Sequence, residues 1–410
     1  MTKKNPVYLT VILVALAIVL TFQITFLAVE GYKPSSDNAT DTQSPSESVI
    51  SKETLNKIKE IAEYYAALYP GEINAETVEK YLINALIEGI GDDHGVYFDN
   101  DAFSATLEGI EGTYKGIGIT ASYNAEQGYI NVSSVMPGSP AEQAGILSGD
   151  VITHIGEGES RVAVGDVGYE SAVSLIRGER GSYVTLTIVR GEESFDLSVM
   201  RDDIINQTVD FHMYSLDARI AVIRISRFEK TTVAQFEDAL AKAKEQGAEA
   251  YVFDVRSNPG GELNTVTKIL DMLLPEGPII RIEFKDEQKN SQINSDAQLL
   301  DAPMTVLCNS STASAGELFT AALKDYKAAT VIGETTYGKG TMQSYVPLTG
   351  GDGLAITIAY YLPPFSENYH GVGVVPDIAL SLSEDIEGTL TDENDNQLQA
   401  AAAELALKLQ

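Results

Sequence analysis

The segment from Met304 to Gln343 constrains this chain most, because its pattern predicts a strand, a turn, a helix and a second strand in close succession. Met304–Cys308 is an apolar run of strand length, and residues 309–313 are small and polar, as in a turn. A helical pattern follows Ser314 and ends before a second apolar run at Ala329–Ile332. Ser314 is therefore predicted at a helix N-terminus, beside free N–H groups and the positive end of the helix dipole.

A single lysine follows in the loop after the second strand. Lys339 stands between Gly338 and Gly340, so no bulky side chain flanks it in the sequence. A serine hydroxyl is a poor nucleophile at neutral pH and needs an adjacent base. A lysine amine can be that base where an apolar pocket lowers its pKa from the ordinary value of about 10.4. We predict that Ser314 is a nucleophile and that Lys339 is its base.

The same residues also fit simpler interpretations. Ser314 followed by Glu317 three residues later matches a capping box, which stabilises a helix without any catalysis. Lys339 by itself fits an exposed lysine of a loop. The segment Gly333–Lys339 has the glycine and lysine spacing of a phosphate-binding loop, but Gly340 replaces the Ser or Thr that would hold magnesium. Nucleotide binding is therefore not predicted.

A family resemblance favours the catalytic interpretation. Three elements resemble, in order, the active-site region of the C-terminal processing peptidases, also called tail-specific proteases: Thr312–Glu317, Ala322–Asp325 and Thr336–Gln343. The resemblance implies that Ser314 is the nucleophile, Lys339 the general base and Gln343 the residue that orients the lysine. It implies a serine endopeptidase with a Ser–Lys dyad.

The peptidase core is predicted at residues 202–385, where strand and helix patterns alternate as in an α/β fold. Active sites of such folds gather at the carboxyl ends of strands. The turn Ser257–Gly261 follows a predicted strand and resembles the Asn-Pro-Gly-Gly loop of the same peptidases. By this resemblance, an N–H group of Gly260 or Gly261 joins the N–H of Ala315 in an oxyanion hole.

A β-rich PDZ domain is predicted at residues 108–201, inserted before the core. Residues 116–119, Pro137–Ile146 and Gly149–Ile152 resemble, in this order, the elements of such a domain. A PDZ domain binds an extended peptide as an added strand and captures its C-terminal carboxylate with backbone N–H groups. The expected ligands are C-terminal tails of protein substrates, with apolar end residues. The resemblance places the cradle for the tail at Gly116, Ile117, Gly118 and Ile119.

Patterns of secondary structure complete this domain. Arg177 lies at the end of a predicted helix and is a candidate contact between the PDZ domain and the core, or else an exposed arginine at a helix end. Short strands alternate with turn signals and are predicted at Gly116–Thr120, Tyr129–Val135, Val151–Ile155 and Val184–Val189.

The first 49 residues differ in kind from the rest. Lys3 and Lys4 precede residues 7–29, an uncharged and mostly apolar run that is long enough to cross a bilayer. Because the lysines favour a cytoplasmic N-terminus and no convincing cleavage site follows, residues 1–30 are predicted to be a transmembrane signal anchor. A cleaved signal peptide is the alternative. Residues 31–49 have the composition of a polar linker, so the rest of the chain is expected outside the cytoplasm at the cell membrane.

Helical segments are predicted at both ends of the remaining chain. Residues 50–107 contain two amphipathic patterns separated by Pro70 and Gly71, and these helices could join two copies into a homodimer. Residues 386–410 end in a helix predicted to begin near Asn396.

Charge and residue counts restrict the partners and leave two other functions open. A net charge of −31 argues against nucleic acid as a partner, and four scattered histidines predict neither a metal site nor a cofactor. One alternative is a Ser–His–Asp hydrolase that uses Ser314 with one of the four histidines, such as His212 or His370, although Thr312–Gly316 lacks the first glycine of the hydrolase elbow. The other is a non-catalytic PDZ scaffold on a degenerate peptidase body.

Overall fold

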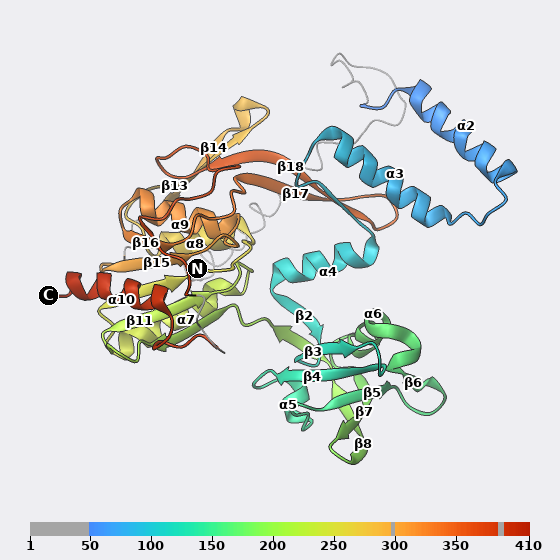
Figure 1. Cartoon of the computed structure of the whole chain (residues 1–410), viewed down its shortest axis with the longest axis horizontal. Helices are drawn as coiled ribbons and strands as arrows, with labels where there is room; N and C mark the ends of the chain where they lie inside the picture. Colours follow the sequence, from blue (N-terminus) through green and yellow to red (C-terminus); the bar gives the residue numbers. More distant parts are fainter. Residues whose placement is uncertain (1–48, 297–299, 384–388) are drawn as a thin grey trace, which may run out of the picture. The chain divides into compact units, whose positions relative to one another are not determined.

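The computed structural model describes residues 49–296, 300–383 and 389–410 of the chain. These residues form two compact units (Figure 1). The first comprises the described residues up to Tyr97 and the hairpin tip Tyr345–Ile356, and the second comprises Phe98–Ser344 and Thr357–Gln410. The predicted signal anchor lies outside the described residues. Within the described ranges, no helix is both long enough and apolar enough to cross a membrane.

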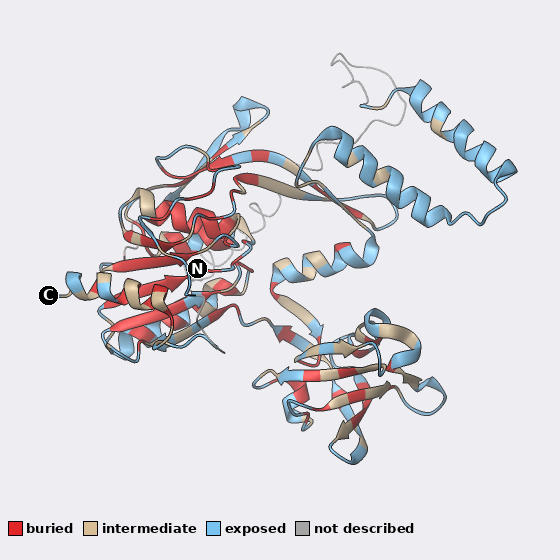
Figure 2. Ribbon diagram, viewed as in Figure 1, coloured by how far each residue is buried: buried red, intermediate tan, exposed pale blue. Residues whose placement is uncertain are grey.

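Two amphipathic helices make up most of the first unit. α2 (Lys52–Leu68) begins after Ser51 and α3 (Ala75–Ile90) begins after Asn74, and both cap residues accept a backbone N–H bond from the first turn. Neither helix contains a buried residue, so most apolar side chains of both are exposed and the rest are half-buried (Figure 2). The helical prediction for this region is incomplete, because the short strand β1 (Val96–Phe98) follows α3.

The second unit begins with α4 (Asn100–Glu111), which continues past the predicted boundary at residue 107. β2 (Thr113–Gly116) follows and pairs antiparallel with β9 (Asp202–Ile205). The predicted strand Gly116–Thr120 is wrong, because Gly118 has a φ of 81° and separates β2 from β3 (Ile119–Asn124).

A β-rich module lies between β2 and β9 in the sequence. Its sheet has the order β3-β4-β5-β7-β8, with β6 also paired to β5. The apolar faces of these strands and of α6 enclose a core that includes Ile130, Ile152, Leu186 and Ala172. The elements are β3 (Ile119–Asn124), β4 (Tyr129–Val135), α5 (Pro140–Gln143), β5 (Val151–Ile155), η1 (Gly158–Ser160), β6 (Val162–Ala163), α6 (Val164–Ile176), β7 (Tyr183–Arg190) and β8 (Glu193–Met200).

A six-stranded sheet of order β10-β11-β12-β15-β16-β19 forms the centre of the peptidase core. β10 is antiparallel to β11, and the other neighbours are parallel, which confirms the predicted α/β class. The strands are β10 (Val209–Met213), β11 (Ile220–Ile225), β12 (Ala250–Asp254), β15 (Met304–Cys308), β16 (Ala329–Gly333) and β19 (Ile378–Ala379).

Helices cover both faces of this sheet, which explains why its central strands are apolar on both sides. On β12, Tyr251 and Phe253 belong to the cluster that includes the buried residues of α7, α8 and α9. Ala250 and Val252 alternate with them and pack in the cluster of α10. The helices are α7 (Thr232–Glu245), α8 (Leu263–Asp271), α9 (Ala315–Asp325) and α10 (Asn396–Lys408).

A second set of strands carries residues toward Ser314. β18 (Gly353–Leu362) pairs with β17 (Thr341–Pro347), and its last residues pair antiparallel with β13. The register sets Tyr361 opposite Ile282. The remaining elements of this part are β13 (Gly277–Phe284), η2 (Glu287–Lys289) and β14 (Ser291–Ser295).

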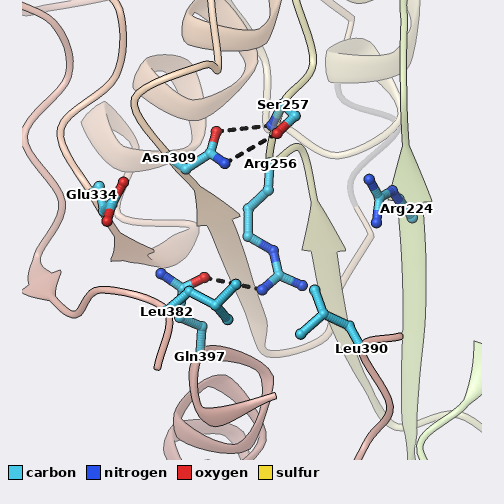
Figure 3. A pocket seen from close by; sticks show the side chains of 8 residues that line it. All are labelled: Arg224, Arg256, Ser257, Asn309, Glu334, Leu382, Leu390 and Gln397. Carbon is cyan, nitrogen blue, oxygen red and sulfur yellow. Dashed lines mark hydrogen bonds between the residues drawn. The ribbon is translucent and has the colours of Figure 1, made fainter. Parts of the chain in front are cut away.

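A buried ion cluster attaches α10 to the sheet. The Arg256 guanidinium donates to both oxygens of Asp254 and of Asp395, and also to Gln397 (3.0 Å). Burial alone would lower the pKa of Arg256, but the hydrogen bonds and charges of the two carboxylates raise it above its ordinary value. Figure 3 shows this side chain beside a cavity of about 150 Å³ at the carboxyl ends of the strands.

Candidate active site

Ser314 stands between β15 and α9, as predicted, and is the N-cap residue of the helix. Its backbone has a φ of 53° and a ψ of −118°, a conformation that L residues other than glycine rarely adopt. The side chain is half-buried. A strained serine at the start of a buried helix matches the position expected of a nucleophile.

The Glu317 carboxylate joins the Ser314 turn to the Lys339 loop. One of its oxygens, Oε2, accepts the backbone N–H groups of Ser314 (2.9 Å) and Lys339 (2.7 Å). The other, Oε1, accepts the Thr336 hydroxyl and the Gly338 N–H, each at 2.6 Å. Glu317 is fully buried. The structure therefore brings the backbones of the predicted nucleophile and base to one carboxylate oxygen. The residue that joins them had no predicted role beyond a helix cap, although it lies within the family motif.

Two buried tyrosines that no sequence motif marks lie against Ser314. The Tyr361 hydroxyl is 3.3 Å from Ser314 Oγ and 2.8 Å from the Lys339 carbonyl oxygen. The Tyr369 hydroxyl donates to the Ser314 carbonyl (3.4 Å). Burial raises the pKa of both phenols, so both stay protonated near neutral pH.

Gln343 lies in β17, four residues after Lys339. Its side-chain Nε2 donates to the hydroxyls of Thr341 (2.9 Å) and Thr357 (3.2 Å). These bonds hold the amide in one orientation within the second unit. Its predicted role of orienting the lysine stays a prediction.

The turn Ser257–Gly261 is bonded directly to the Ser314 turn. The buried Asn258 accepts the Ala313 N–H at its carbonyl (2.9 Å), and Figure 3 shows Asn309 bonded to Ser257 on the cavity side. The Gly260 N–H, a predicted oxyanion donor, instead donates to Asn258 Oδ1 (2.8 Å). This bond leaves the N–H groups of Gly261 and Ala315 as the remaining predicted donors.

Gly260 also lies very close to the nucleophile. A Cβ atom added to Gly260 would be 2.7 Å from Ser314 Cβ and 3.0 Å from the Ala315 nitrogen. Only a residue without a side chain allows this approach.

The predicted cradle for a peptide tail forms the connection between β2 and β3. The Ile117 carbonyl accepts the Ala141 N–H (2.8 Å), and the Gly118 carbonyl accepts the Met136 N–H (3.0 Å). Gly116 ends β2, and Ile119 begins β3, which is the terminal strand in its sheet order. A terminal strand offers one edge to which an added peptide strand can bond.

Arg177 ends α6 and contacts residues that precede the PDZ sheet. Its guanidinium lies over the Tyr114 ring, 5.6 Å from the centroid, and Nη1 is 3.7 Å from a Glu108 carboxylate oxygen. These partners belong to β2 and α4, so the predicted contact with residues 202–385 stays a prediction.

Two of the four histidines that the alternative hydrolase mechanism could use have other described partners. His212 Nε2 is 2.9 Å from Asp392 Oδ1, and the His370 ring packs edge-on against Tyr360 at 5.9 Å. In the described part of the chain, no group of three His, Cys, Asp or Glu side chains is arranged to hold a metal ion.

Comparison with known proteins gives the family. The model of peptidase family S41 matches residues 219–380, and the model of a PDZ domain matches residues 132–190. A "Probable CtpA-like serine protease" of Staphylococcus epidermidis is 30% identical over 338 residues, which are 81% of this chain and 67% of that protein. The chain belongs to the C-terminal processing peptidases of family S41. The resemblance predicted from the sequence is thus confirmed.

Other relatives are similar over comparable lengths. A Staphylococcus aureus protein of the same name is 32% identical over 329 residues, and the chain spans only 64% of that relative's length. Among solved structures, the photosystem II D1 C-terminal processing protease is 27% identical, with a TM-score of 0.45, over 79% of this chain and 86% of that one. The tricorn protease is 17% identical, with a TM-score of 0.47, over 87% of this chain and 35% of that one.

Proposed function

We propose that this protein is a serine endopeptidase in which Ser314 is the nucleophile and Lys339 is the general base. One observation carries the proposal: the N–H groups of both residues donate to the same oxygen of the buried Glu317. The N-terminal end of α9 adds a positive dipole at the position where the hydroxyl must lose its proton.

Cleavage then follows the general order of acyl transfer. The neutral Lys339 amine takes the proton of the Ser314 hydroxyl, and Oγ attacks the carbonyl carbon of the scissile peptide bond. The N–H groups of Ala315 and Gly261 donate to the oxyanion of the tetrahedral intermediate. The lysine ammonium returns the proton to the leaving amine as the peptide bond breaks. Water, deprotonated by the same amine, then hydrolyses the acyl ester and frees Ser314.

Substitutions distinguish this mechanism from the two alternatives. Ser314→Ala and Lys339→Ala are each expected to abolish cleavage of an unfolded protein substrate, whereas His212→Ala and His370→Ala retain it. Loss of turnover in a histidine variant, with Lys339→Ala still active, would refute the Ser–Lys mechanism. If the wild-type protein cleaves nothing under any condition, the PDZ scaffold becomes the better explanation.

We propose that the β-rich module recognises the C-terminal tails of substrates. The open edge of β3 and the cradle Gly116–Ile119 support this role. A peptide with an apolar C-terminal residue and a free carboxylate is expected to bind, and the same peptide with an amidated end is expected to bind at least tenfold more weakly. Equal affinity of the two peptides, measured by fluorescence anisotropy, would contradict tail recognition.

We propose that residues 1–30 anchor the protein in the cell membrane, with the catalytic part outside the cytoplasm. The apolar run at residues 7–29 and the preceding lysines support this topology. The protein is expected to stay in the membrane pellet after alkaline extraction and to be digested by protease added outside intact cells. Its recovery from the cytosolic fraction would refute the topology.

We propose that α2 and α3 join two copies of the chain. These helices bury none of their residues, and two of their large apolar side chains, Leu68 and Tyr81, are 75% and 74% exposed. Leu68→Glu together with Tyr81→Glu is expected to convert a dimer to a monomer in sedimentation, and Glu60→Lys on the same helix pair serves as the charge-change control. A wild-type protein that sediments as a monomer at all concentrations would exclude the dimer.

A further inference from the structure

We propose that Tyr361 is a positioning residue for cleavage, whose hydroxyl sets the Ser314 hydroxyl and the Lys339 backbone in place relative to each other. The inference rests on the proposed roles of Ser314 and Lys339. It adds a residue that no part of the sequence pattern had marked for catalysis.

The number of protons decides how these groups interact. The Tyr361 hydroxyl has one proton and three neighbours: the Lys339 carbonyl oxygen at 2.8 Å, Ser314 Oγ at 3.3 Å, and the Tyr369 hydroxyl, which donates a hydrogen bond to it. A carbonyl can only accept, and its distance is the shorter, so the phenol proton belongs to the bond with Lys339. One lone pair of the phenol oxygen accepts the Tyr369 hydroxyl, and with the phenol proton on the Lys339 carbonyl the other lone pair accepts the proton of the Ser314 hydroxyl. This arrangement holds Oγ in one rotamer before the base removes that proton.

Tyr361 is itself held rigidly next to the lysine loop. Its backbone N–H donates to the Gly340 carbonyl (3.2 Å), and Asn368 Nδ2 donates to the carbonyls of both Gly340 (3.0 Å) and Tyr361 (2.8 Å). The residue is 4% exposed, and its ring packs edge-on against Tyr369, with ring centroids 5.9 Å apart. The hydroxyl therefore has little freedom, which is what a positioning group needs.

The position of Tyr361 also limits what it can do chemically. Burial raises the pKa of this phenol, so it stays neutral over the pH range in which a protease works. It can orient the reacting groups by hydrogen bonds, but it does not exchange protons with them. Loss of the hydroxyl should therefore reduce kcat and leave KM and the shape of the pH profile unchanged.

Tyr361→Phe tests this role, because phenylalanine keeps the buried ring and removes only the hydroxyl. In the full-length protein, kcat per titrated active site is expected to fall roughly tenfold, the rate equivalent of one hydrogen bond, with KM within twofold. Labelling of Ser314 by a fluorophosphonate should slow by a similar factor. The neighbouring Tyr360→Phe is the matched control, because Tyr360 is 51% exposed and lies on the other face of β18. It should leave both rates unchanged.

The outcomes separate this inference from the proposed function. An active Ser314→Ala variant would overturn the proposed function itself. If Ser314→Ala is inactive but Tyr361→Phe retains the wild-type kcat and labelling rate, only the positioning role is wrong. A displaced alkaline or acidic limb in the pH profile of Tyr361→Phe would also overturn it, because the phenol would then take part in proton transfer. A kcat loss confined to Tyr361→Phe supports it.

Discussion

Replacement of Glu317 by Gln should separate the Ser314 turn from the Lys339 loop. The carboxylate receives four donors: two backbone N–H groups at Oε2, and one N–H and one hydroxyl at Oε1. A glutamine side chain has nearly the same shape, but it replaces one acceptor oxygen by an NH₂ group that only donates. Whichever way the amide turns, at least one backbone N–H then faces another donor.

The expected loss of stability is that of the less harmful of the two orientations of the amide group that Glu317→Gln introduces. With the NH₂ group on the Oε1 side, the Thr336 hydroxyl can turn and accept, but the Gly338 N–H is left buried without a partner. An unsatisfied buried donor costs about 1–3 kcal/mol, and the two bonds kept at the other oxygen lose the part of their strength that came from charge. We expect Glu317→Gln to lower the free energy of unfolding by roughly 2–5 kcal/mol.

Urea unfolding followed by circular dichroism measures this loss, and fluorophosphonate labelling of Ser314 measures its effect on the site. Glu334→Gln is a matched control, because that carboxylate receives only a long bond from the Ser310 hydroxyl (3.4 Å) among the contacts described. It should unfold within about 0.5 kcal/mol of the wild type. If Glu317→Gln unfolds and labels like the wild type, the carboxylate does not hold the two catalytic segments together.

Two further substitutions test the surroundings of the site and the PDZ module. Gly260→Ala should lower kcat at least tenfold, because its Cβ would meet Ser314 Cβ at 2.7 Å. Gly350→Ala is the control, because Gly350 has a similar φ but open space around it. If the two variants have the same kcat, the close approach of Gly260 to Ser314 does not matter for cleavage. Asp150 is buried, and its hydrogen bonds with Arg190 lower its pKa in the folded state. The carboxylate therefore adds stability at pH values above its unfolded pKa of about 3.9, and this gain is lost as the pH falls through the lower folded pKa. Asp150→Asn should lower the free energy of unfolding by about 1.5–3 kcal/mol at pH 7, and this difference from the wild type should vanish in acid. A difference that does not change with pH would show that the charge of Asp150 is not what stabilises the fold.

Local patterns were sufficient for much of the fold and for the main catalytic candidates. The apolar run Met304–Cys308, the polar turn and the helix pattern after Ser314 are local features, and the structure contains each of them at the predicted place. The alternation of strands and helices likewise predicted the α/β core, because a βαβ unit needs both elements in that order. Where a single glycine changes the path of the backbone, as Gly118 does, the apolar pattern alone gave a wrong strand.

The resemblance to family motifs assigned chemical roles to residues, but it could not say which groups are in contact. Gly260 and Gly261 are equal candidates in the sequence, and only the bond from the Gly260 N–H to Asn258 distinguishes them. The family motif includes Glu317, yet its spacing to Ser314 equally fits a helix cap.

By itself, the order of residues determined which segments become strands and helices, since periodicity and turn residues act over a few positions along the chain. Tertiary structure alone decided which distant groups meet. Glu317 meets Lys339 from 22 positions away, and Tyr361 reaches Ser314 across 47. Such contacts depend on the register of strands and on the packing of a helix against its sheet, and neither can be predicted from a short stretch of sequence.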